Sequence, residues 1–393
     1  MKKLLIPNGS FHDIPLIKTA KELGYYVITS GAAPDGKGHG YADEYVYGDF
    51  SDVELMLKIA KEKKIDAVCS NCNDFGYLSA CYIAEKMGLG GHESYENALI
   101  LHHKDKFKKF AKANKMYSPI ADDFCDAFSA YEYAETADYP IIIKPTDLGA
   151  GQGIHRADSI TEAKKYIDEA FAKSKAKNIV IEPFIEGTAH SFNAFVVNKK
   201  VVGYYSDNEY MKYSTYRVST SAGPADFIDE VKDILIEQTE LVADKLELTD
   251  GLVHSQYILD KEHIPHILEI TRRMSGDWYP YPEMRATGVN WMEYIVKAQC
   301  KMDCSDFPKD MVQKGFTGRH CLNSKKTGIV KDVKLKPEFK KYVFDRAMWL
   351  EDGFEIKNIE KDYPGILFFD FETREQMMEI VRNIDEYIEL MYE

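Results

Sequence analysis

Strand and helix patterns alternate along the first hundred residues. Short apolar runs, among them KLLIPN, YYVITS and IDAVCS, alternate with amphipathic segments of helical period such as DVELMLKIAKEKK and GYLSACYIAEKMG. This alternation predicts a parallel sheet with helices on its faces, because parallel strands need crossover connections. Ligands of such folds bind at the carboxyl ends of the strands. Here those ends lead into the segments Asn8–His12 and Asn71–Asp74.

The composition excludes several classes of protein. A chain of 393 residues with 45% hydrophobic side chains is long enough for two or three domains. The net charge of -14 would repel a nucleic-acid backbone. The N-terminal segment MKKLLIPNGS has too few consecutive apolar residues for a signal peptide or a membrane span. Seven cysteines with one isolated CSNC pair favour reduced thiols. We therefore expect a cytoplasmic protein that binds neither nucleic acid nor membrane.

The segment PIIIKPTDLGAGQG, residues 140–153, combines a buried-strand pattern with one lysine and three glycines. Lys144 stands where the strand leaves the core, and a buried ammonium group is costly unless it finds an anion. Gly149, Gly151 and Gly153 allow backbone amides to approach a negatively charged group. A phosphate would satisfy both features. The residues alone also leave open a mobile turn whose lysine reaches into solvent.

The order and spacing of four segments resemble the ATP-grasp superfamily, in particular its carbamoyl-phosphate-synthetase-like carboxylate–amine ligases. The segments are the pair Asp105–Lys106, PIIIKPTDLGAGQG, VIEPFIEG and ILEITRRMSGD, and the likeness covers roughly residues 1–300. It implies an α/β fold of ATP-grasp architecture, with a parallel-sheet pre-ATP-grasp domain, a two-lobed ATP-binding region and a small C-terminal α+β subdomain. The implied boundaries are 1–100 for the N-terminal domain, 101–186 for the small lobe, 187–310 for the large lobe and 311–393 for the C-terminal subdomain.

The resemblance also implies an ATP site. Lys106 and Lys144 look like the paired lysines beside the nucleotide phosphates, and the glycine-rich segment looks like the loop that covers them. VIEPFIEG resembles the segment that joins the two lobes and reads the adenine edge, although Ala189 replaces a glutamate that is common there. The implied ATP-binding residues are Lys106, Lys144, Gly149, Gly151, Gly153, Glu182, Pro183, Ile185 and His190.

A metal site is implied on the strands GLVHSQYIL and HILEIT. Glu269 matches a metal-binding glutamate of the family, whereas Gln256 and Thr271 replace the usual glutamate and asparagine. If the hairpin turns over residues 261–264, Gln256 and Glu269 lie opposite each other and can share an ion. Magnesium or manganese with one glutamate stays feasible. A purely structural role for Gln256 is the alternative.

The remaining candidates belong to catalysis and substrate binding. Arg273 looks like the arginine that holds an acyl phosphate, and Lys212 resembles a further phosphate-contacting lysine or is a plain loop lysine. Candidate contacts to the substrates are Arg217, Asp277 and Arg285.

The implied reaction is ATP-dependent joining of a small-molecule carboxylate to an amine through an acyl phosphate, with release of ADP and phosphate. Two alternatives stay open: a bicarbonate-activating carboxylase of the same fold, and a nucleotide-binding module without catalysis. A dehydrogenase is disfavoured because PNGSFHD, not GxGxxG, follows the first strand. The sequence identifies neither the substrates nor the oligomeric state, and a homodimer is compatible with it.

Overall fold

A four-stranded parallel sheet with order β3-β2-β1-β4 forms the N-terminal domain, as the alternating pattern predicted. The computed structural model describes residues 1–70, 72–149, 151–309 and 311–393. Asn71 and Ala150, which belong to two segments predicted to bind ligands, lie outside the described residues. The strands are β1 (Lys3–Pro7), β2 (Tyr26–Gly31), β3 (Glu44–Tyr47) and β4 (Ala67–Val68), and the helices are α1 (Ile14–Glu22), α2 (Val53–Lys63) and α3 (Asp74–Met87).

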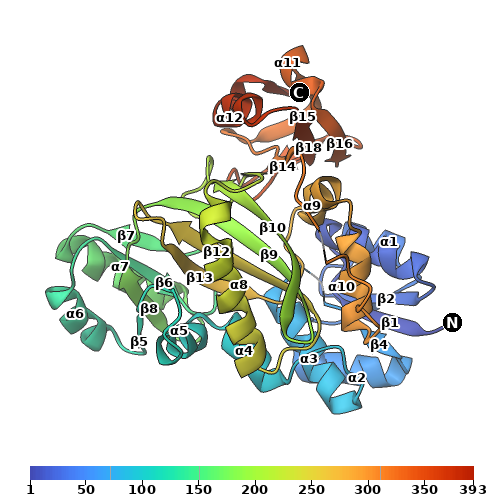
Figure 1. The fold of residues 1–393 in the computed structure, drawn as a ribbon, viewed down its shortest axis with the longest axis horizontal. Coiled ribbons are helices and arrows are strands. Elements are labelled where there is room, and N and C mark those ends of the chain that lie inside the picture. The colour runs from blue at the N-terminus through green and yellow to red at the C-terminus, as the bar shows by residue number, and fades with distance from the viewer. Residues whose placement is uncertain (71, 150, 310) are drawn as a thin grey trace.

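A small antiparallel sheet with order β5-β8-β6-β7 forms a separate lobe at the left of Figure 1. Two helices pack on this sheet, and Ser159 caps the second by accepting from the Glu162 amide. The strands are β5 (Asp122–Phe124), β6 (Ile141–Pro145), β7 (His155–Ala157) and β8 (Ile179–Pro183). The helices are α6 (Ala127–Thr136) and α7 (Ile160–Lys173), and α4 (Tyr95–His102) and α5 (Lys104–Ala113) precede the lobe in the chain.

An eight-stranded sheet with order β13-β12-β9-β10-β11-β14-β18-β16 forms the centre of the molecule (Figure 1). The long helix α8 (Ile228–Lys245) packs on its strands β9, β12 and β13. The strands from the middle of the chain are β9 (Thr188–Val197), β10 (Lys200–Tyr210), β11 (Thr220–Ala222), β12 (Gly251–Leu259) and β13 (Pro265–Thr271). Two helices, α9 (Pro280–Thr287) and α10 (Trp291–Gln299), follow β13.

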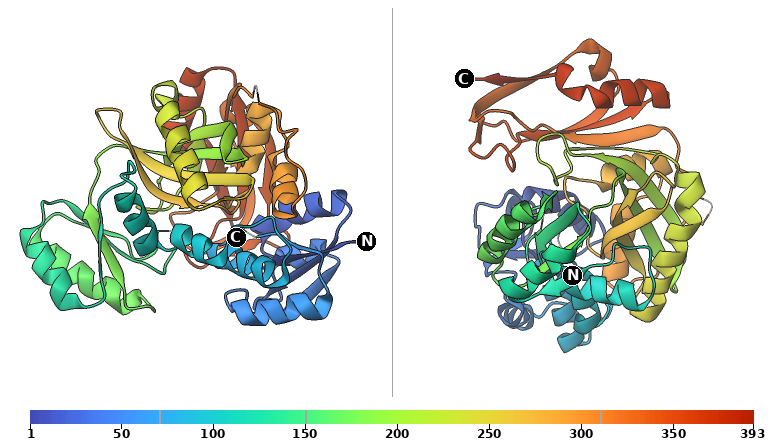
Figure 2. Two further views of the ribbon diagram at one scale, coloured as in Figure 1. Left: turned by 60° about the horizontal axis from the view of Figure 1, so that its bottom comes forward. Right: turned by 90° about the vertical axis from the view of Figure 1, so that its left-hand side faces the viewer.

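The C-terminal strands extend this same sheet, because β14 pairs with β11. The sheet therefore crosses the boundary predicted at residues 310 and 311, and the C-terminal part forms a layer beside the large lobe (Figure 2). Its strands in the large sheet are β14 (Phe316–Cys321), β16 (Val343–Met348) and β18 (Gly365–Phe371). Its other elements are β15 (Gly328–Leu335), β17 (Phe354–Ile356), β19 (Ile388–Tyr392), α11 (Pro337–Lys340) and α12 (Arg374–Arg382).

The N-terminal domain shares a hydrophobic core with the large lobe. Leu16 and Ile17 of α1 belong to the same buried cluster as Trp291 and Ile295 of α10. This shared core holds the carboxyl ends of the parallel strands next to the central sheet. No helix among the described residues is long and apolar enough to cross a bilayer, and all seven cysteines are free thiols.

Candidate functional site

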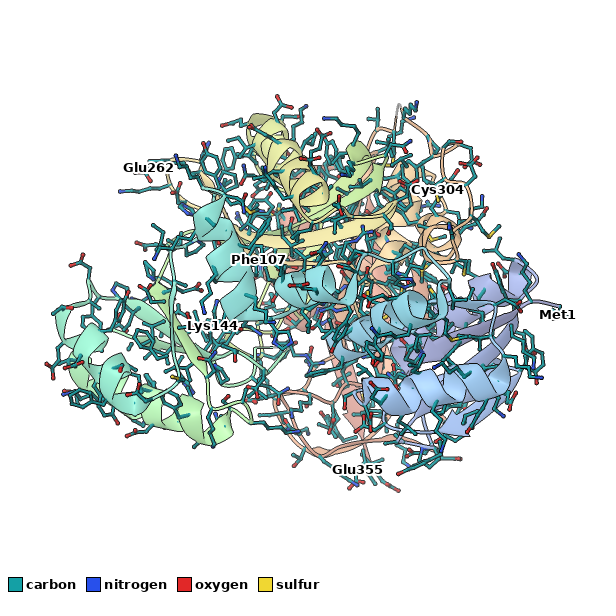
Figure 3. The ribbon with its side chains drawn as sticks, turned by 90° about the horizontal axis from the view of Figure 1, so that it is seen from below. Met1, Phe107, Lys144, Glu262, Cys304 and Glu355 are labelled. Atoms are coloured by element: carbon teal, nitrogen blue, oxygen red, sulfur yellow. The ribbon has the colours of Figure 1, made fainter. Side chains whose placement is uncertain are left out.

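A cavity of about 360 Å³ lies where the lobes and domains meet. The N-terminal domain contributes His12 and Asp74, which follow β1 and β4 as the strand-end rule predicted. Figure 3 shows Lys144 on the side of the small lobe that faces the central body, with Phe107 of α5 near the centre. The charged and polar residues that line the cavity include His12, Asp74, Lys104, Lys144, Glu209, Arg217, His254, Gln256, Glu269, Thr271, Arg273, Asp277 and Arg319.

Lys144 is a buried cation in a buried strand. Every residue of β6 is buried, and Lys144 is only 6% exposed. Its ammonium group pairs with Glu182 of β8, whose second oxygen lies 3.0 Å from Lys108 Nζ. Burial alone would raise the pKa of Glu182, but the two lysines hold it below its ordinary value. One carboxylate thus faces two ammonium groups, and the cluster has spare positive charge for an anion.

The second lysine in the cavity is Lys104, not the predicted Lys106. Lys104 Nζ donates to the carbonyl of Leu148 at 2.6 Å, and burial lowers its pKa. Lys106 is exposed and does not line the cavity. Both belong to α5, where residues two apart point about 200° away from each other. Phe107 and Lys108 are buried, and they follow Lys104 by three and four residues along the helix. Lys104, and not Lys106, therefore shares the buried side of α5.

The glycine-rich segment borders the cavity through Gly149 and Gly151. Gly151 has a φ of +73°, and a Cβ there would lie 2.6 Å from the carbonyl oxygen of Tyr216. Only glycine allows the segment to pass this backbone. Gly153 lines an adjoining cavity instead and packs against Pro145.

Gln256, Glu269 and Thr271 all line the cavity from β12 and β13. Gln256 pairs directly with Glu269, as predicted, but the turn between their strands differs from the expected one. Leu259 pairs with Pro265, so the turn is one residue longer than expected, and a bulge beside Gln256 restores the register. Gln256 Nε2 donates to both oxygens of Glu209 at 2.9 and 2.7 Å. Its amide oxygen therefore stays available to accept or to ligate.

The side-chain oxygens of Gln256, Glu269 and Thr271 fit a hard divalent cation whose remaining ligands are phosphate and water oxygens. Thr271 is 4% exposed, and its hydroxyl has no hydrogen-bond partner among the described residues. In the described part of the chain no three His, Cys, Asp or Glu side chains come together as a metal cage. Magnesium needs no such cage when phosphates and waters complete its shell.

Glu209 of β10 is a cavity residue that the sequence analysis missed. Burial, reinforced by nearby Asp207, raises the pKa of Glu209 to about 8. Strand alternation could have found it, because Asp207 and Glu209 share one face of β10. No motif marked that face as the one toward the cavity.

The pKa of Glu209 predicts a pH-dependent stability. A carboxyl group that keeps its proton in the folded state stabilises the protein below the unfolded pKa, and this stability is lost as pH rises toward about 8. As pH rises from the unfolded pKa of the carboxyl group to about 8, the free energy of unfolding of the ligand-free protein should fall by a few kcal/mol. Each unit of difference between the folded and unfolded pKa corresponds to about 1.4 kcal/mol. Urea unfolding at several pH values measures this effect. Glu209→Gln should flatten the slope, and an unchanged slope would contradict the assignment.

The far end of the cavity contains two guanidinium–carboxylate pairs. Arg273 Nε lies 2.9 Å from Asp74 Oδ1, and although burial opposes it, Arg273 and His102 hold the pKa of Asp74 far below its ordinary value. Asp277 Oδ2 lies 3.4 Å from Arg319 of β14. The two pairs come from separate parts of the chain, and His254 lies near both guanidinium groups, which together with burial lower its pKa to about 3.

Several predicted residues lie away from this cavity. Arg285, predicted as a substrate contact, is exposed, pairs with Asp370 at 2.8 Å and does not line the cavity. Lys212 donates to the carbonyl of Arg382 at 2.7 Å beside the adjoining cavity. His190 is buried, bonded to Thr188 and stacked on Tyr257. Pro183 ends β8 and Ile185 follows it, and neither lines the cavity.

Residues 103–277 match the family described as phosphoribosylglycinamide synthetase, ATP-grasp (A) domain. The carbamoyl phosphate synthase large chain of Clostridium acetobutylicum is 22% identical over 272 residues, which cover 65% of this chain and 24% of that protein. The L-amino acid ligase of Bacillus licheniformis superposes with a TM-score of 0.83 at 18% identity, covering 100% of this chain and 99% of that one. Phosphoribosylglycinamide synthetase from Anaerococcus prevotii gives 0.78 at 22% identity, with 100% of both chains covered.

The fold defines a two-lobed α/β protein with a basic cleft between its lobes. The family match covers residues 103–277, and the solved structures share the fold over the full chain, so the predicted fold class is confirmed. The chain spans about a quarter of the length of the carbamoyl phosphate synthase that it matches.

Proposed function

We propose that the chain is an ATP-dependent ligase that activates a carboxylate as an acyl phosphate and joins it to an amine. The observation that carries this proposal is the gathering of Lys144, Glu269 and Arg273 around one cavity. The names of its structural neighbours, an L-amino acid ligase and phosphoribosylglycinamide synthetase, agree with the same reaction class.

Lys104 and Lys144 would hold the nucleotide phosphates, and the amides of Gly149 and Gly151 would approach them from the covering loop. Charge-assisted hydrogen bonds of this type are roughly twice as strong as neutral ones. The spare positive charge around Glu182 supports this assignment. The adenine would lie outside this cavity, at the end of β8, where the exposed Pro183 offers only a carbonyl to its edge.

Glu269, the Gln256 amide oxygen and the Thr271 hydroxyl would hold a magnesium or manganese ion. When bound, the ion would neutralise phosphate charge. Gln256 is held in place for this task by its two hydrogen bonds to Glu209.

The first step transfers a phosphoryl group. A carboxylate oxygen of the substrate attacks the γ-phosphorus, the bond to the β–γ bridging oxygen breaks, and ADP departs. In the second step the amine nitrogen attacks the acyl carbon, phosphate departs with the electron pair of the carbon–oxygen bond, and the nitrogen loses a proton to water. Arg273, fixed by Asp74, would hold the acyl phosphate with the guanidinium N–H groups that Asp74 and the Met274 carbonyl leave unused. Positioning and charge stabilisation supply most of the catalysis in such reactions.

Trapping of the acyl phosphate tests this function directly. The full chain is incubated with magnesium, ATP, hydroxylamine and a panel of organic acids, and both ADP and hydroxamate are measured. We expect matched formation of the two products with at least one acid. ADP release that depends on bicarbonate alone would indicate a bicarbonate-activating enzyme. Normal ATP binding without any turnover would indicate a nucleotide-binding module.

The two neighbouring lysines of α5 provide a matched pair of variants. Lys104→Ala should weaken ATP binding by about tenfold or more, because it removes a half-buried cation from the cavity. Lys106→Ala removes the same charge from the exposed side of the helix and should leave the affinity unchanged. Isothermal titration with ATP measures both. Weakening by Lys106→Ala alone would restore the original assignment.

A further inference from the structure

The C-terminal subdomain supplies residues to the end of the cavity beyond Arg273. Arg319 of β14 lines the cavity, and Tyr363, just before β18, bonds the Asp277 carboxylate through its hydroxyl. Arg217, from the segment between β10 and β11, donates to the Glu360 carbonyl of the same subdomain at 2.6 Å. These three residues and Asp277 are called the acceptor cluster below.

Arg319 is a buried guanidinium with unused hydrogen-bonding capacity. It is 5% exposed, and its closest carboxylate oxygen is 3.4 Å away on Asp277. Its Nη1 also lies 3.4 Å from the sulfur of Cys321, a weak acceptor. Its Nε has no hydrogen-bond partner among the described residues. Buried donors are normally satisfied, so an orphan N–H beside a cavity indicates a partner supplied by a ligand.

Arg217 adds a positive charge that no carboxylate in the described part of the chain neutralises. Its only hydrogen bond goes to a neutral carbonyl, and its guanidinium lies 5.5 Å from the centre of the Tyr363 ring. Asp277 pairs with Arg319, and Asp74 pairs with Arg273. Of these three guanidinium groups, Arg217 is thus the one without an ion pair among the described residues. An anionic group of a ligand would supply its partner.

The backbone at Asp277 and Trp278 is strained, and this conformation fixes the position of the Asp277 side chain at this end of the cavity. Asp277 and Trp278 have φ values of 58° and 53°, a left-handed conformation that is costly for two successive residues with side chains. Hydrogen bonds from the N-terminal domain hold them there. The Asp277 amide donates to His12 Nδ1 at 3.0 Å, and the Trp278 indole donates to the Phe11 carbonyl at 2.9 Å. The Asp277 carboxylate is thereby aimed at Arg319.

We propose that Arg217 and Arg319 bind a carboxylate of the amine substrate, which is therefore an amino acid. This inference rests on the proposed ligase function and names the class of its second substrate. The planar forks of two arginines suit the two oxygens of a carboxylate. Arg217 also lines the adjoining cavity of about 1420 Å³, which gives the amine a route that does not cross the lysine end. The bound carboxylate takes no part in the bonds that form and break.

The test compares acceptors with and without a carboxylate. The full chain reacts with ATP, magnesium, the acid that gives most hydroxamate, and one of three acceptors: hydroxylamine, a proteinogenic amino acid, or the C-terminal amide of that amino acid. The wild-type protein should use free amino acids at least about tenfold better in kcat/KM than their amides. Amides that serve equally well would overturn the proposal.

Variants then locate the effect. Arg217→Ala and Arg319→Gln should raise the KM for the free amino acid about tenfold or more, leave the KM for its amide unchanged, and preserve hydroxamate formation. Arg217 is only partly buried, so its variant tests the proposal even if Arg319→Gln does not fold, which thermal unfolding would reveal. Arg346→Gln, on the exposed strand β16, is the matched control and should change nothing.

The outcomes separate the two proposals. Loss of hydroxamate in the arginine variants would place the acid, not the amine, at the acceptor cluster and would overturn the assignment. Absence of hydroxamate in the wild-type protein with every acid would refute the ligase reaction, and the amine subsite with it.

Discussion

Glu269→Gln should abolish turnover while part of the ATP affinity remains. The substitution keeps the size of the side chain but removes the one carboxylate among the three proposed metal ligands. Gln256 and Thr271 would then offer only neutral oxygens, whereas protein magnesium sites normally retain one or two carboxylates. The lysines of the cavity are untouched, so the phosphates keep those contacts. ADP release at saturating ATP and isothermal titration with ATP measure the two effects separately. A fully active variant would overturn the metal assignment.

Gln256→Glu is the informative partner of that experiment. It would set a second carboxylate against Glu209, which now accepts both hydrogens of the Gln256 amide. Manganese binding, followed by electron paramagnetic resonance, should tighten if position 256 ligates the ion. The metal-free protein should lose stability through like-charge contact in a buried site. Unchanged metal dependence would place Gln256 outside the coordination shell.

Lys144→Ala should lower the affinity for ATP by about tenfold or more. The triphosphate would lose a charged partner in a largely buried site, which costs about 1.5 to 3 kcal/mol. Stability without nucleotide should change little, because Lys108 still neutralises Glu182 at 3.0 Å. Isothermal titration and thermal unfolding measure the two quantities. Lys109→Ala, which removes an exposed lysine of α5 that pairs with Asp123 at 2.9 Å, is the control. Normal ATP binding by Lys144→Ala would refute the role of Lys144.

Local patterns predicted the fold and the parts of the site that depend on neighbouring residues in the chain. The strand PIIIKP is buried and ends in a buried lysine because its apolar run is continuous. Gln256 and Glu269 pair because a single hairpin joins them, and the bulge compensates for the longer turn. In both cases the interacting groups lie within one or two adjacent elements.

The sequence did not show which side of a helix a residue occupies, or which residues far apart in the chain come into contact. Lys104 and Lys106 differ only in which side of α5 they occupy, and this depends on how the helix packs. Arg319 reaches the cavity only because β14 pairs with β11, nearly a hundred residues away in the chain. Arg285 stands closer in sequence to Arg273, yet α9 carries it to the surface, where it pairs with Asp370.

The acceptor cluster belongs to no single part of the chain. Arg217 precedes the central hairpin, Asp277 follows it, and Arg319 and Tyr363 come from the C-terminal subdomain, while His12 of the N-terminal domain accepts from the Asp277 amide. The lysine and metal positions, by contrast, all lie between residues 104 and 271. Under the proposed function, Arg217 would share the stretch of the gene that encodes the ATP site, whereas Arg319 and Tyr363 would be encoded after it. Mutational drift in the C-terminal strands could then change the product of the enzyme while its consumption of ATP stayed intact.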